Sequence, residues 1–525
     1  MTAIGAQFRL IKAGWIFARE GVVAALPGDQ LEGMPRFVWR VGKWLARPRS
    51  RHRDRATRIT RAIERLGPSY VKLGQFLATR PDIVGPELAR DLSMLHDRME
   101  TFPIEASRAA IEGSIGRPCD EVFVKLNPPV AAASIAQVHP AVIRGPDGRN
   151  HDVAVKVIRP GVRRRFYNDL ESFFLAARMQ ERFVPATRRL RPVEVAQTLA
   201  QTTRIEMDLR LEAAALSELA ENTRDDPGFR TPAVDWERTG RDVVTMEWID
   251  GIKMSNTDAL RASHHDLPNL AVCLIQSFLR HAMRDGFFHA DMHPGNLFVE
   301  PDGTIVAVDL GISGRLGRKE RRFLAEILYG FITRDYRRVA DVHFEAGYVP
   351  RKHDPASFAQ AIRAIGEPIH GQSAETISMA KLLTLLFEVT ELFDMETRTE
   401  LIMLQKTMVT VEGVSRTLDP HFNMWKAAEP VVRECLTIEL GPQAILEDLK
   451  SNAHVLLSVL RQGPDAMRRV EKIADDLEHL IEGGLSVADE SVERLSRAGS
   501  RFARVGRISL WIIAACAVWI AWQVT

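Results

Sequence analysis

The sequence predicts an α+β protein of two lobes, with helical regions before and after them and an apolar helix at the end of the chain. At 525 residues, the chain is too long for one ordinary domain. Short apolar segments separated by turn residues fill 121–245, which is typical of a small sheet. After Gly311, apolar residues recur at about 3.6-residue spacing, which indicates helices. We therefore expect a smaller lobe built on a sheet, followed by a larger helical lobe.

The composition is that of a globular protein, with 46% hydrophobic and 26% charged residues. A net charge of only +2 gives no reason to expect nucleic acid as a partner. No two of the four cysteines form a CxxC pair, which argues against a zinc site or a disulfide framework and favours a reducing compartment. The cysteines are Cys119, Cys273, Cys435 and Cys516.

Residues 1–60 form a predicted amphipathic and basic N-terminal region. Phe8, Ile11, Trp15 and Ile16 recur at helical spacing, but charged residues interrupt them, so the segment is not a signal peptide. This helix either touches a membrane or packs on the protein. The nine basic residues that follow bind anionic lipid headgroups or form a solvated linker, and nucleic acid is the weakest of the three interpretations. They are Arg36, Arg40, Lys43, Arg47, Arg49, Arg51, Arg53, Arg55 and Arg58.

A helical extension is predicted over 61–120. Within it, 66–82 reads LGPSYVKLGQFLATRPD, and its apolar residues fall on one face of a helix. Lys72 and Gln75 are three residues apart and therefore share another face. Taken alone, they would be an exposed polar pair on a structural helix.

The smaller lobe is predicted over 121–245, with strands at 121–126, 138–143 and 152–158. Small side chains fill the loop between the first two strands. They let backbone N–H groups approach a bound phosphate, as a glycine-rich loop does in protein kinases. The candidate nucleotide-binding residues of this loop are Val130, Ala131, Ala132, Ala133, Ser134, Ile135, Ala136, Gln137 and Val138.

Lys156 lies within an otherwise apolar strand, where a lysine is costly unless it has a partner. Protein kinases place a lysine at such a V-A-I-K position to hold the α- and β-phosphates of ATP, paired with a helix glutamate. Glu206 and Glu212 are both candidates for that partner. They lie in 205–214, a charged, alanine-rich stretch that predicts one helix.

A further strand ends near Met246, where the larger lobe, 246–440, begins. In a two-lobed kinase-like fold the chain that follows joins the lobes, and its backbone meets the adenine ring. Met246 is then the residue just before that connection. Helices of the larger lobe are predicted at 319–345, 375–393 and 398–414.

The most specific pattern is HADMHPGN followed by an apolar strand and Asp309-Leu310-Gly311. Asn296 lies five residues after Asp291, and Asp309 thirteen residues later, as the kinase order D-x-x-x-x-N and D-x-G requires. Asp291 can accept a proton from an attacking hydroxyl or water. Asn296 and Asp309 supply oxygen ligands that suit Mg²⁺.

A rival interpretation treats His289, Asp291 and a second histidine as a non-haem iron site. His293 is too near in sequence to be a typical third ligand. The iron interpretation also leaves Lys156 and Asp309 unexplained, so we rank it below phosphoryl transfer.

Beyond the larger lobe, charged amphipathic helices are predicted over 441–505 and a transmembrane anchor over 506–525. Residues 508–524 carry no charge and are near the lower length limit for crossing a bilayer, a buried helix being the alternative. The arginines at 501, 504 and 507 place the upstream chain in the cytoplasm by the positive-inside tendency.

Together these motifs resemble the UbiB/ADCK family of atypical protein-kinase-like proteins, over roughly 61–420. The K-L-G-Q motif and the alanine-rich loop distinguish that family from aminoglycoside and choline kinases. The resemblance implies a two-lobed protein-kinase-like fold that binds ATP and Mg²⁺. It also implies that Glu212 pairs with Lys156, while Lys72 and Gln75 contact Glu206 and Asp208 and their helix blocks protein substrates.

The resemblance further implies an ATPase or conditional kinase that supports ubiquinone biosynthesis at the bacterial inner membrane, with its catalytic domain facing the cytoplasm. Membrane lipids, prenyl-quinone intermediates and other quinone-biosynthesis proteins are then the expected partners. A nucleotide-binding pseudokinase scaffold and a kinase of a small lipid are the alternatives. The chain departs from protein kinases in having His289-Ala290-Asp291 for H-R-D, which puts control by activation-loop phosphorylation in doubt.

Overall fold

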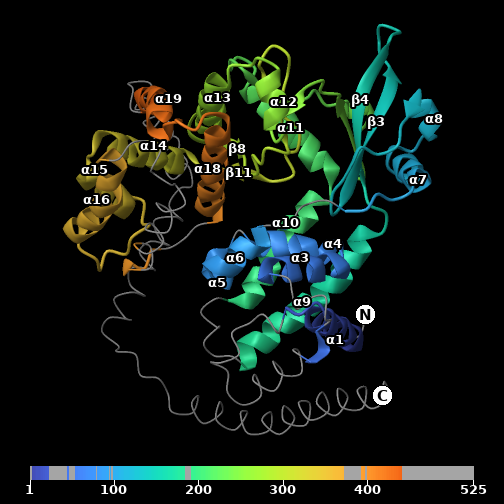
Figure 1. Ribbon diagram of the computed structural model, residues 1–525, viewed down its shortest axis with the longest axis horizontal. Helices are drawn as coiled ribbons and strands as arrows, with labels where there is room; N and C mark the ends of the chain where they lie inside the picture. The colour runs from blue at the N-terminus through green and yellow to red at the C-terminus, as the bar shows by residue number, and fades with distance from the viewer. Residues whose placement is uncertain are drawn as a thin grey trace, which may run out of the picture. The chain divides into compact units, whose positions relative to one another are not determined.

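A computed structural model describes residues 3–22, 44–46, 54–78, 80–93, 95, 99–183, 191–371, 389, 392–395 and 399–439. They belong to one compact unit, residues 1–439 (Figure 1). The predicted regions 441–505 and 506–525, and most of the helix predicted at 375–393, lie outside the described residues.

The smaller lobe is built on an antiparallel sheet in the order β1-β3-β4-β6, with β2 also paired to β3. β3 and β4 pair along their whole length, so the strands predicted at 138–143 and 152–158 are confirmed. The strands are β1 (Lys125–Leu126), β2 (Ala131–Ala132), β3 (Ala136–Arg144), β4 (Asn150–Ile158) and β6 (Val243–Glu247).

Two helices that the sequence placed in the extension pack on this sheet instead. α7 (Ile104–Ile115) and α8 (Cys119–Val122) bury Ile111 and Val122 against Val153 and its neighbours on β4. The strand predicted at 121–126 is therefore wrong in its first half, where the chain forms the last turn of α8. The apolar residues there are buried by a helical turn, and sequence alternation over so few residues does not distinguish the two.

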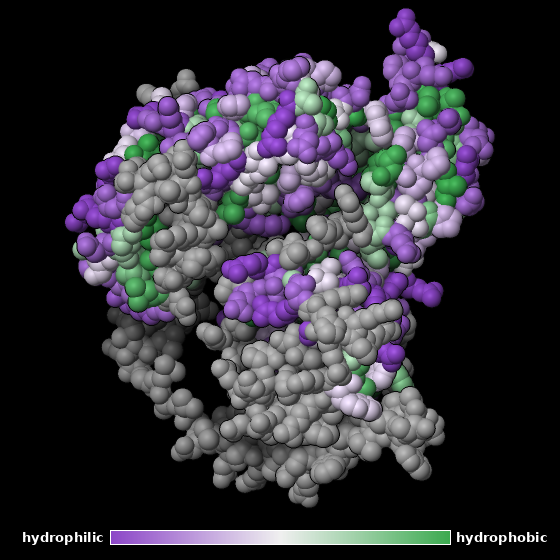
Figure 2. All heavy atoms as spheres, viewed as in Figure 1, coloured by the Kyte–Doolittle hydropathy of each residue, from purple (hydrophilic) through white to green (hydrophobic). Residues whose placement is uncertain are grey.

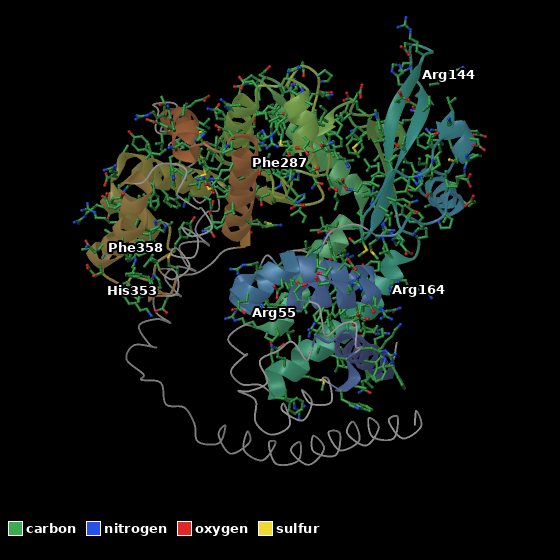
Figure 3. All side chains as sticks on the ribbon, viewed as in Figure 1. Arg55, Arg144, Arg164, Phe287, His353 and Phe358 are labelled. Atoms are coloured by element: carbon green, nitrogen blue, oxygen red, sulfur yellow. The ribbon has the colours of Figure 1, made fainter. Side chains whose placement is uncertain are left out.

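In the described residues from 54 to 93, the helical extension has four helices. They are α3 (Arg55–Leu66), α4 (Pro68–Ala78), α5 (Pro81–Val84) and α6 (Pro86–Ser93). Gly67 has a φ of 98°, which lets the chain turn sharply between α3 and α4. Arg55, labelled in Figure 3, bonds Asp91 at 2.5 Å and so ties α3 to α6.

The N-terminal helix α1 (Ala3–Arg19) packs on α9 (Val162–Phe183). Arg9 of α1 bonds Ser172 at 3.0 Å and Glu171 at 3.1 Å. Phe8, on the predicted apolar face, remains 68% exposed. The predicted alternatives for this helix are membrane contact and packing on the protein. The structure shows that one face of α1 packs on the protein, while the face with Phe8 is exposed.

The larger lobe holds two small sheets, in the orders β5-β10-β9-β7 and β11-β8, packed among helices. The strands are β5 (Phe229–Arg230), β7 (Ile252–Lys253), β8 (Phe287–His289), β9 (Leu297–Val299), β10 (Ile305–Ala307) and β11 (Ser313–Arg315). β10 is the apolar strand predicted before Asp309. Phe287, labelled in Figure 3, starts the strand that leads into the predicted catalytic loop.

Most helices of this lobe contribute to one apolar core, whereas two of them enclose a separate cluster that includes Tyr336 and Phe358. The helices are α12 (Thr257–Ala262), α13 (Leu267–Arg280), the π-helical turn η5 (His281–Asp285), α14 (Arg318–Thr333), α15 (Tyr336–Glu345), α16 (Pro355–Gly371), α18 (Thr399–Leu418) and α19 (Met424–Glu439). The helix predicted at 319–345 is two helices, because Arg334 is left-handed and Asp335 caps α15. The helix predicted at 398–414 is confirmed as α18.

Hydrophilic side chains cover most of the coloured surface in Figure 2, with apolar side chains in small patches among them. Within the part of the chain that the structure describes, no helix is both long and apolar enough to cross a bilayer. The predicted membrane segment at 508–524 is not in that part.

Candidate active site

Lys156 is held between two carboxylates that come from different parts of the chain. It lies on β4, and its Nζ atom donates to Glu212 Oε1 at 2.6 Å and to Asp309 Oδ2 at 3.0 Å. Glu212 lies on α11 (Leu209–Asn222), which packs against β6, the strand next to β4. Of the two glutamates that the residues left open, the structure brings Glu212 to Lys156.

These groups set one another's charge. Burial works against the charged form of Lys156, but Asp309 and Glu212 outweigh it and raise the pKa of Lys156. Burial raises the pKa of Glu212 to about 7 despite the lysine. For Asp309 the effect of burial is outweighed by Lys156 and by the Gly311 N–H group, which together lower its pKa to about 2. Both shifts favour the charged forms of Lys156 and Asp309.

The single helix predicted at 205–214 is two helices. α10 (Pro192–Glu206) ends just before Asp208, which has extended backbone angles and caps α11. Its carboxylate accepts from the Arg210 N–H at 3.3 Å and from the Arg210 guanidinium at 2.9 and 2.7 Å. An aspartate that bonds its own backbone two residues on competes with helix continuation, which explains the break.

Lys72 reaches this junction from the extension. It lies on α4, and its Nζ atom is 2.5 Å from Glu206 Oε2, with 14% and 4% of the two side chains exposed. A Cβ atom at Gly74 would lie 2.4 Å from Leu95, so only glycine lets α4 approach that closely without a shift. Gln75 is half-buried on the same helix. Asp208, which the resemblance also places near α4, bonds Arg210 through both carboxylate oxygens.

The alanine-rich loop is the β2–β3 hairpin. The Val130 N–H donates to the Val138 carbonyl at 2.9 Å, and Ala133 N–H to the Ala136 carbonyl at 2.7 Å. The Gln137 side chain is fully buried on the far side of the strand, where it bonds the backbone of Phe102 and the hydroxyl of Ser107. Its side chain therefore fastens α7 to the sheet, which is not the role predicted for it; the loop backbone remains the candidate phosphate cradle.

Met246 lies near the end of β6, opposite Ala154, and is buried. This places it one residue before the strand ends, at the connection to the larger lobe. The structure is consistent here with the expected position of the chain between the lobes.

The loop from His289 to Asn296 is held by its own hydrogen bonds. The Asp291 N–H donates to His289 Nδ1 at 3.2 Å, which requires a neutral imidazole, and burial lowers the pKa of His289. The Asn296 amide donates to the Asp291 carbonyl at 3.2 Å and to its Oδ2 at 3.4 Å. The Val308 N–H donates to the Asn296 carbonyl at 3.0 Å, so the loops that carry Asp291 and Asp309 are joined.

The same geometry weakens the iron interpretation. His293 is exposed, and its Nδ1 accepts from the Gly295 N–H at 3.1 Å, while His289 uses its Nδ1 for Asp291. Among the residues described, no group of three or more His, Cys, Asp and Glu side chains is arranged to hold a metal. Both histidines cap turns of the loop.

Comparison with known proteins agrees with this arrangement. The ABC1 atypical kinase-like domain matches residues 94–343, and the UbiB helical domain matches residues 362–423. A probable protein kinase UbiB from Marinobacter nauticus is 37% identical over 462 residues, which cover 87% of this chain and 83% of that protein. The chain belongs to the UbiB family.

A probable protein kinase UbiB from Cronobacter sakazakii is 36% identical to this UbiB-family chain over 488 residues, covering 90% of this chain and 89% of that one. A solved structure, the complex of Rv3197 with erythromycin from Mycobacterium tuberculosis, matches 72% of this chain and 95% of its own at 25% identity, with a TM-score of 0.48.

The UbiB helical domain brings a residue to the site that was not predicted. Lys406 of α18 places its Nζ atom 3.4 Å from Asp291 Oδ1. The neighbouring Thr407 hydroxyl lies 2.9 Å from the Ala290 carbonyl and 2.8 Å from the Met403 carbonyl of its own helix. From the sequence alone, a lysine on an amphipathic helix predicts a solvent-exposed face. Nothing in the sequence near Lys406 marks it as different.

The residues fit Mg²⁺ as a bound cation. Asp309 is 41% exposed, and its carboxylate oxygens accept from Lys156 and from the Gly311 N–H. Asn296 bonds Asp291 through its amide nitrogen, so these bonds do not use its amide oxygen. An all-oxygen donor set of one carboxylate and one amide matches the preference of Mg²⁺, which usually completes its shell with phosphate and water.

Proposed function

We propose that this UbiB-family chain binds Mg-ATP and directs attack on its γ-phosphate, as an atypical kinase or ATPase. The observation that supports this most is the position of Lys156, a cation paired with both Glu212 and Asp309 beside the loop that carries Asp291. A purely structural salt bridge needs only Lys156 and Glu212. The additional bond to Asp309, whose loop adjoins the partly exposed Asp291, is what favours a nucleotide site.

Each residue has a distinct task in the proposal. Lys156 binds the α- and β-phosphates, and the backbone of the β2–β3 hairpin covers them. Asp291, 37% exposed, orients the attacking hydroxyl or water and accepts its proton. Asn296 and Asp309 would hold Mg²⁺, which when bound neutralises charge on the phosphate oxygens.

We further propose that this activity supports ubiquinone biosynthesis at the inner membrane of a bacterium, with the catalytic lobes in the cytoplasm. Family membership and the bacterial relatives named UbiB support this. Anionic headgroups, prenyl-quinone intermediates and other enzymes of quinone biosynthesis are the proposed partners. The ion pair that holds α4 beside the site, Lys72 with Glu206, favours water or a small lipid hydroxyl over a protein as acceptor.

ATP hydrolysis by the purified full chain, with Mg²⁺ and anionic liposomes, tests the proposal. Asp291→Asn keeps the shape of the side chain but removes the proton acceptor, so we expect turnover to fall by about 10²–10⁴-fold. Asp258→Asn, at a 93% exposed position on α12, is the matched control and should be unchanged.

Equal turnover in the wild type and Asp291→Asn would refute the assignment. Transfer of labelled phosphate to a lipid extract would identify a lipid kinase. Nucleotide binding without turnover in either protein would indicate a scaffold.

A further inference from the structure

Lys406 is held in place by the packing of α18 and does not behave as a free surface lysine. Thr407, the next residue, is 1% exposed, and its hydroxyl lies within hydrogen-bond distance, 2.9 Å, of the carbonyl of Ala290, one residue before Asp291. Further along α18, the buried Ser415 hydroxyl donates to the Ala271 carbonyl of α13 at 3.2 Å. The helix is therefore fixed at two points, and Lys406 lies between the catalytic loop and solvent, 39% exposed.

The catalytic loop itself offers no cation. From His289 to Asn296 it contains neither lysine nor arginine. Lys156 is already bonded to Glu212 and Asp309 on the side of the smaller lobe. Phosphoryl transfer spreads negative charge over the equatorial oxygens of the moving phosphate, and fixed cations aimed at that charge lower the barrier.

Distances place Lys406 within reach of that charge. A proton acceptor such as Asp291 must lie about 3 Å from the attacking oxygen. That oxygen in turn lies about 3–3.5 Å from the phosphorus before transfer. Since Lys406 Nζ is 3.4 Å from Asp291 Oδ1, these distances place the ammonium within about 10 Å of the phosphorus at most, a range that a partly exposed lysine side chain shortens by rotation.

We propose that Lys406 is a catalytic residue of this site: the cation on the acceptor side of the transferred phosphate, supplied by the UbiB helical domain. The inference rests on the proposed function. In the step, the acceptor oxygen bonds the γ-phosphorus, the bond from that phosphorus to the β-phosphate oxygen breaks, and ADP leaves. The acceptor proton passes to Asp291, while Lys406 stays protonated and bonds the phosphoryl oxygens.

This assignment makes the helical domain part of the active site. Residues 362–423 include α18, so the kinase-like domain at 94–343 lacks one charge without it. Movement of α18 relative to the catalytic loop would then change turnover without altering nucleotide binding at Lys156.

The test uses the full chain with Lys406→Met, Lys406→Arg, Asp291→Asn and, as the matched control, Lys426→Met, an exposed lysine on α19. Two quantities are measured: kcat for ATP hydrolysis, and the ratio of affinities for Mg-ADP with and without aluminium fluoride, which mimics the transferred phosphate. We expect Lys406→Met to lower kcat by about 10²–10³-fold, as loss of one oxyanion donor does. The affinity gained from aluminium fluoride should fall at least tenfold, with the affinity for Mg-ADP unchanged and Lys406→Arg partly active.

Wild-type kcat together with a wild-type affinity ratio in Lys406→Met would overturn the inference. So would an equal loss of affinity for Mg-ADP with and without aluminium fluoride, because that pattern describes a structural lysine. Failure of the proposed function looks different: wild type and Asp291→Asn would hydrolyse ATP at equal rates. The ratio of Mg-ADP affinities with and without aluminium fluoride can be measured without turnover. It therefore still tests whether Lys406 contacts the transferred phosphate.

Discussion

Lys156 stays charged although it is buried, because two carboxylates pair with it. Only 11% of its side chain and 5% of that of Glu212 are exposed, so neither would remain charged alone. The second carboxylate, Asp309, is more open to solvent and keeps the lysine protonated. Removing one member of such a set leaves an uncompensated group, which costs more than the pair itself contributes.

We predict that Lys156→Met lowers the free energy of unfolding by about 3 kcal/mol, because Glu212 is left buried without its cation. Adding Glu212→Gln to that variant should restore part of the loss, since the amide is neutral at that position without having to bind a proton. Urea unfolding of both single variants and the double variant gives the coupling between them. Additive effects would show that the pair does not interact energetically in the folded protein.

At the scale of elements, one short break between helices organises the neighbourhood of Lys156. α10 ends at Glu206, which pairs with Lys72 of α4, and α11 begins after Asp208 and presents Glu212 to Lys156. The side chain of Asp208 caps α11 and thereby fixes the turn between the two helices, which a continuous helix over 205–214 would lack. The position of α4 is thus linked to the helix that carries the partner of Lys156.

Lys72→Met should release α4 from α10. Glu206, 4% exposed, would lose its cation, and we expect the local opening free energy of α4 to fall by about 2–3 kcal/mol. Amide hydrogen exchange along Pro68–Ala78 should then be roughly 30–100 times faster. Lys125→Met, at an exposed lysine on β1, is the control, and unchanged exchange in α4 of Lys72→Met would contradict the linkage.

Across the whole molecule, Arg230 joins the two lobes. Its guanidinium bonds both oxygens of Glu247, at the end of β6, at 2.8 Å. It also bonds both oxygens of Glu300, just after β9, at 2.8 and 2.6 Å. The paired, planar geometry suits arginine, and a lysine could not make all four bonds.

Glu247→Gln should destabilise the protein in a pH-dependent way. Burial tends to raise the pKa of Glu247, but bonds from Arg230 and the Ala233 N–H outweigh it and lower the pKa. A lowered folded pKa gives stability that is present above the unfolded value of 4.5 and is lost as the pH falls through the folded value. With 37% exposure, we expect about 1 kcal/mol at pH 7 and a vanishing difference in strong acid, measured by urea unfolding. A difference that persists in strong acid would exclude the ionised carboxylate as the cause.

The membrane attachment of the chain is a prediction for residues outside those described. Deleting the predicted anchor from residue 508 onward should move the protein from the membrane fraction to the soluble fraction, because the other uncharged run of that length, 126–143, is used in strands β1, β2 and β3 of the smaller lobe. Fractionation of cells that express both forms measures this. Continued attachment would point to another surface, and the open face of α1 with Phe8 would be the first to examine.

The sequence alone was sufficient to predict the family and the order of the candidate site residues along the chain. The strands β3, β4 and β6, the spacing of Asp291, Asn296 and Asp309, and the family itself follow from local patterns, because phosphoryl transfer restricts residue types at fixed intervals.

Only the tertiary structure decided which distant groups meet. Local periodicity left Glu206 and Glu212 equal as partners of Lys156, and the structure confirms Glu212, as the family resemblance implied. Gln137 turns away toward α7, and Lys406 arrives beside Asp291 from 115 residues further along the chain. A glutamate or lysine on an amphipathic helix has the same local pattern whether it faces water or a buried partner. Its role depends on packing between elements, which local periodicity does not record.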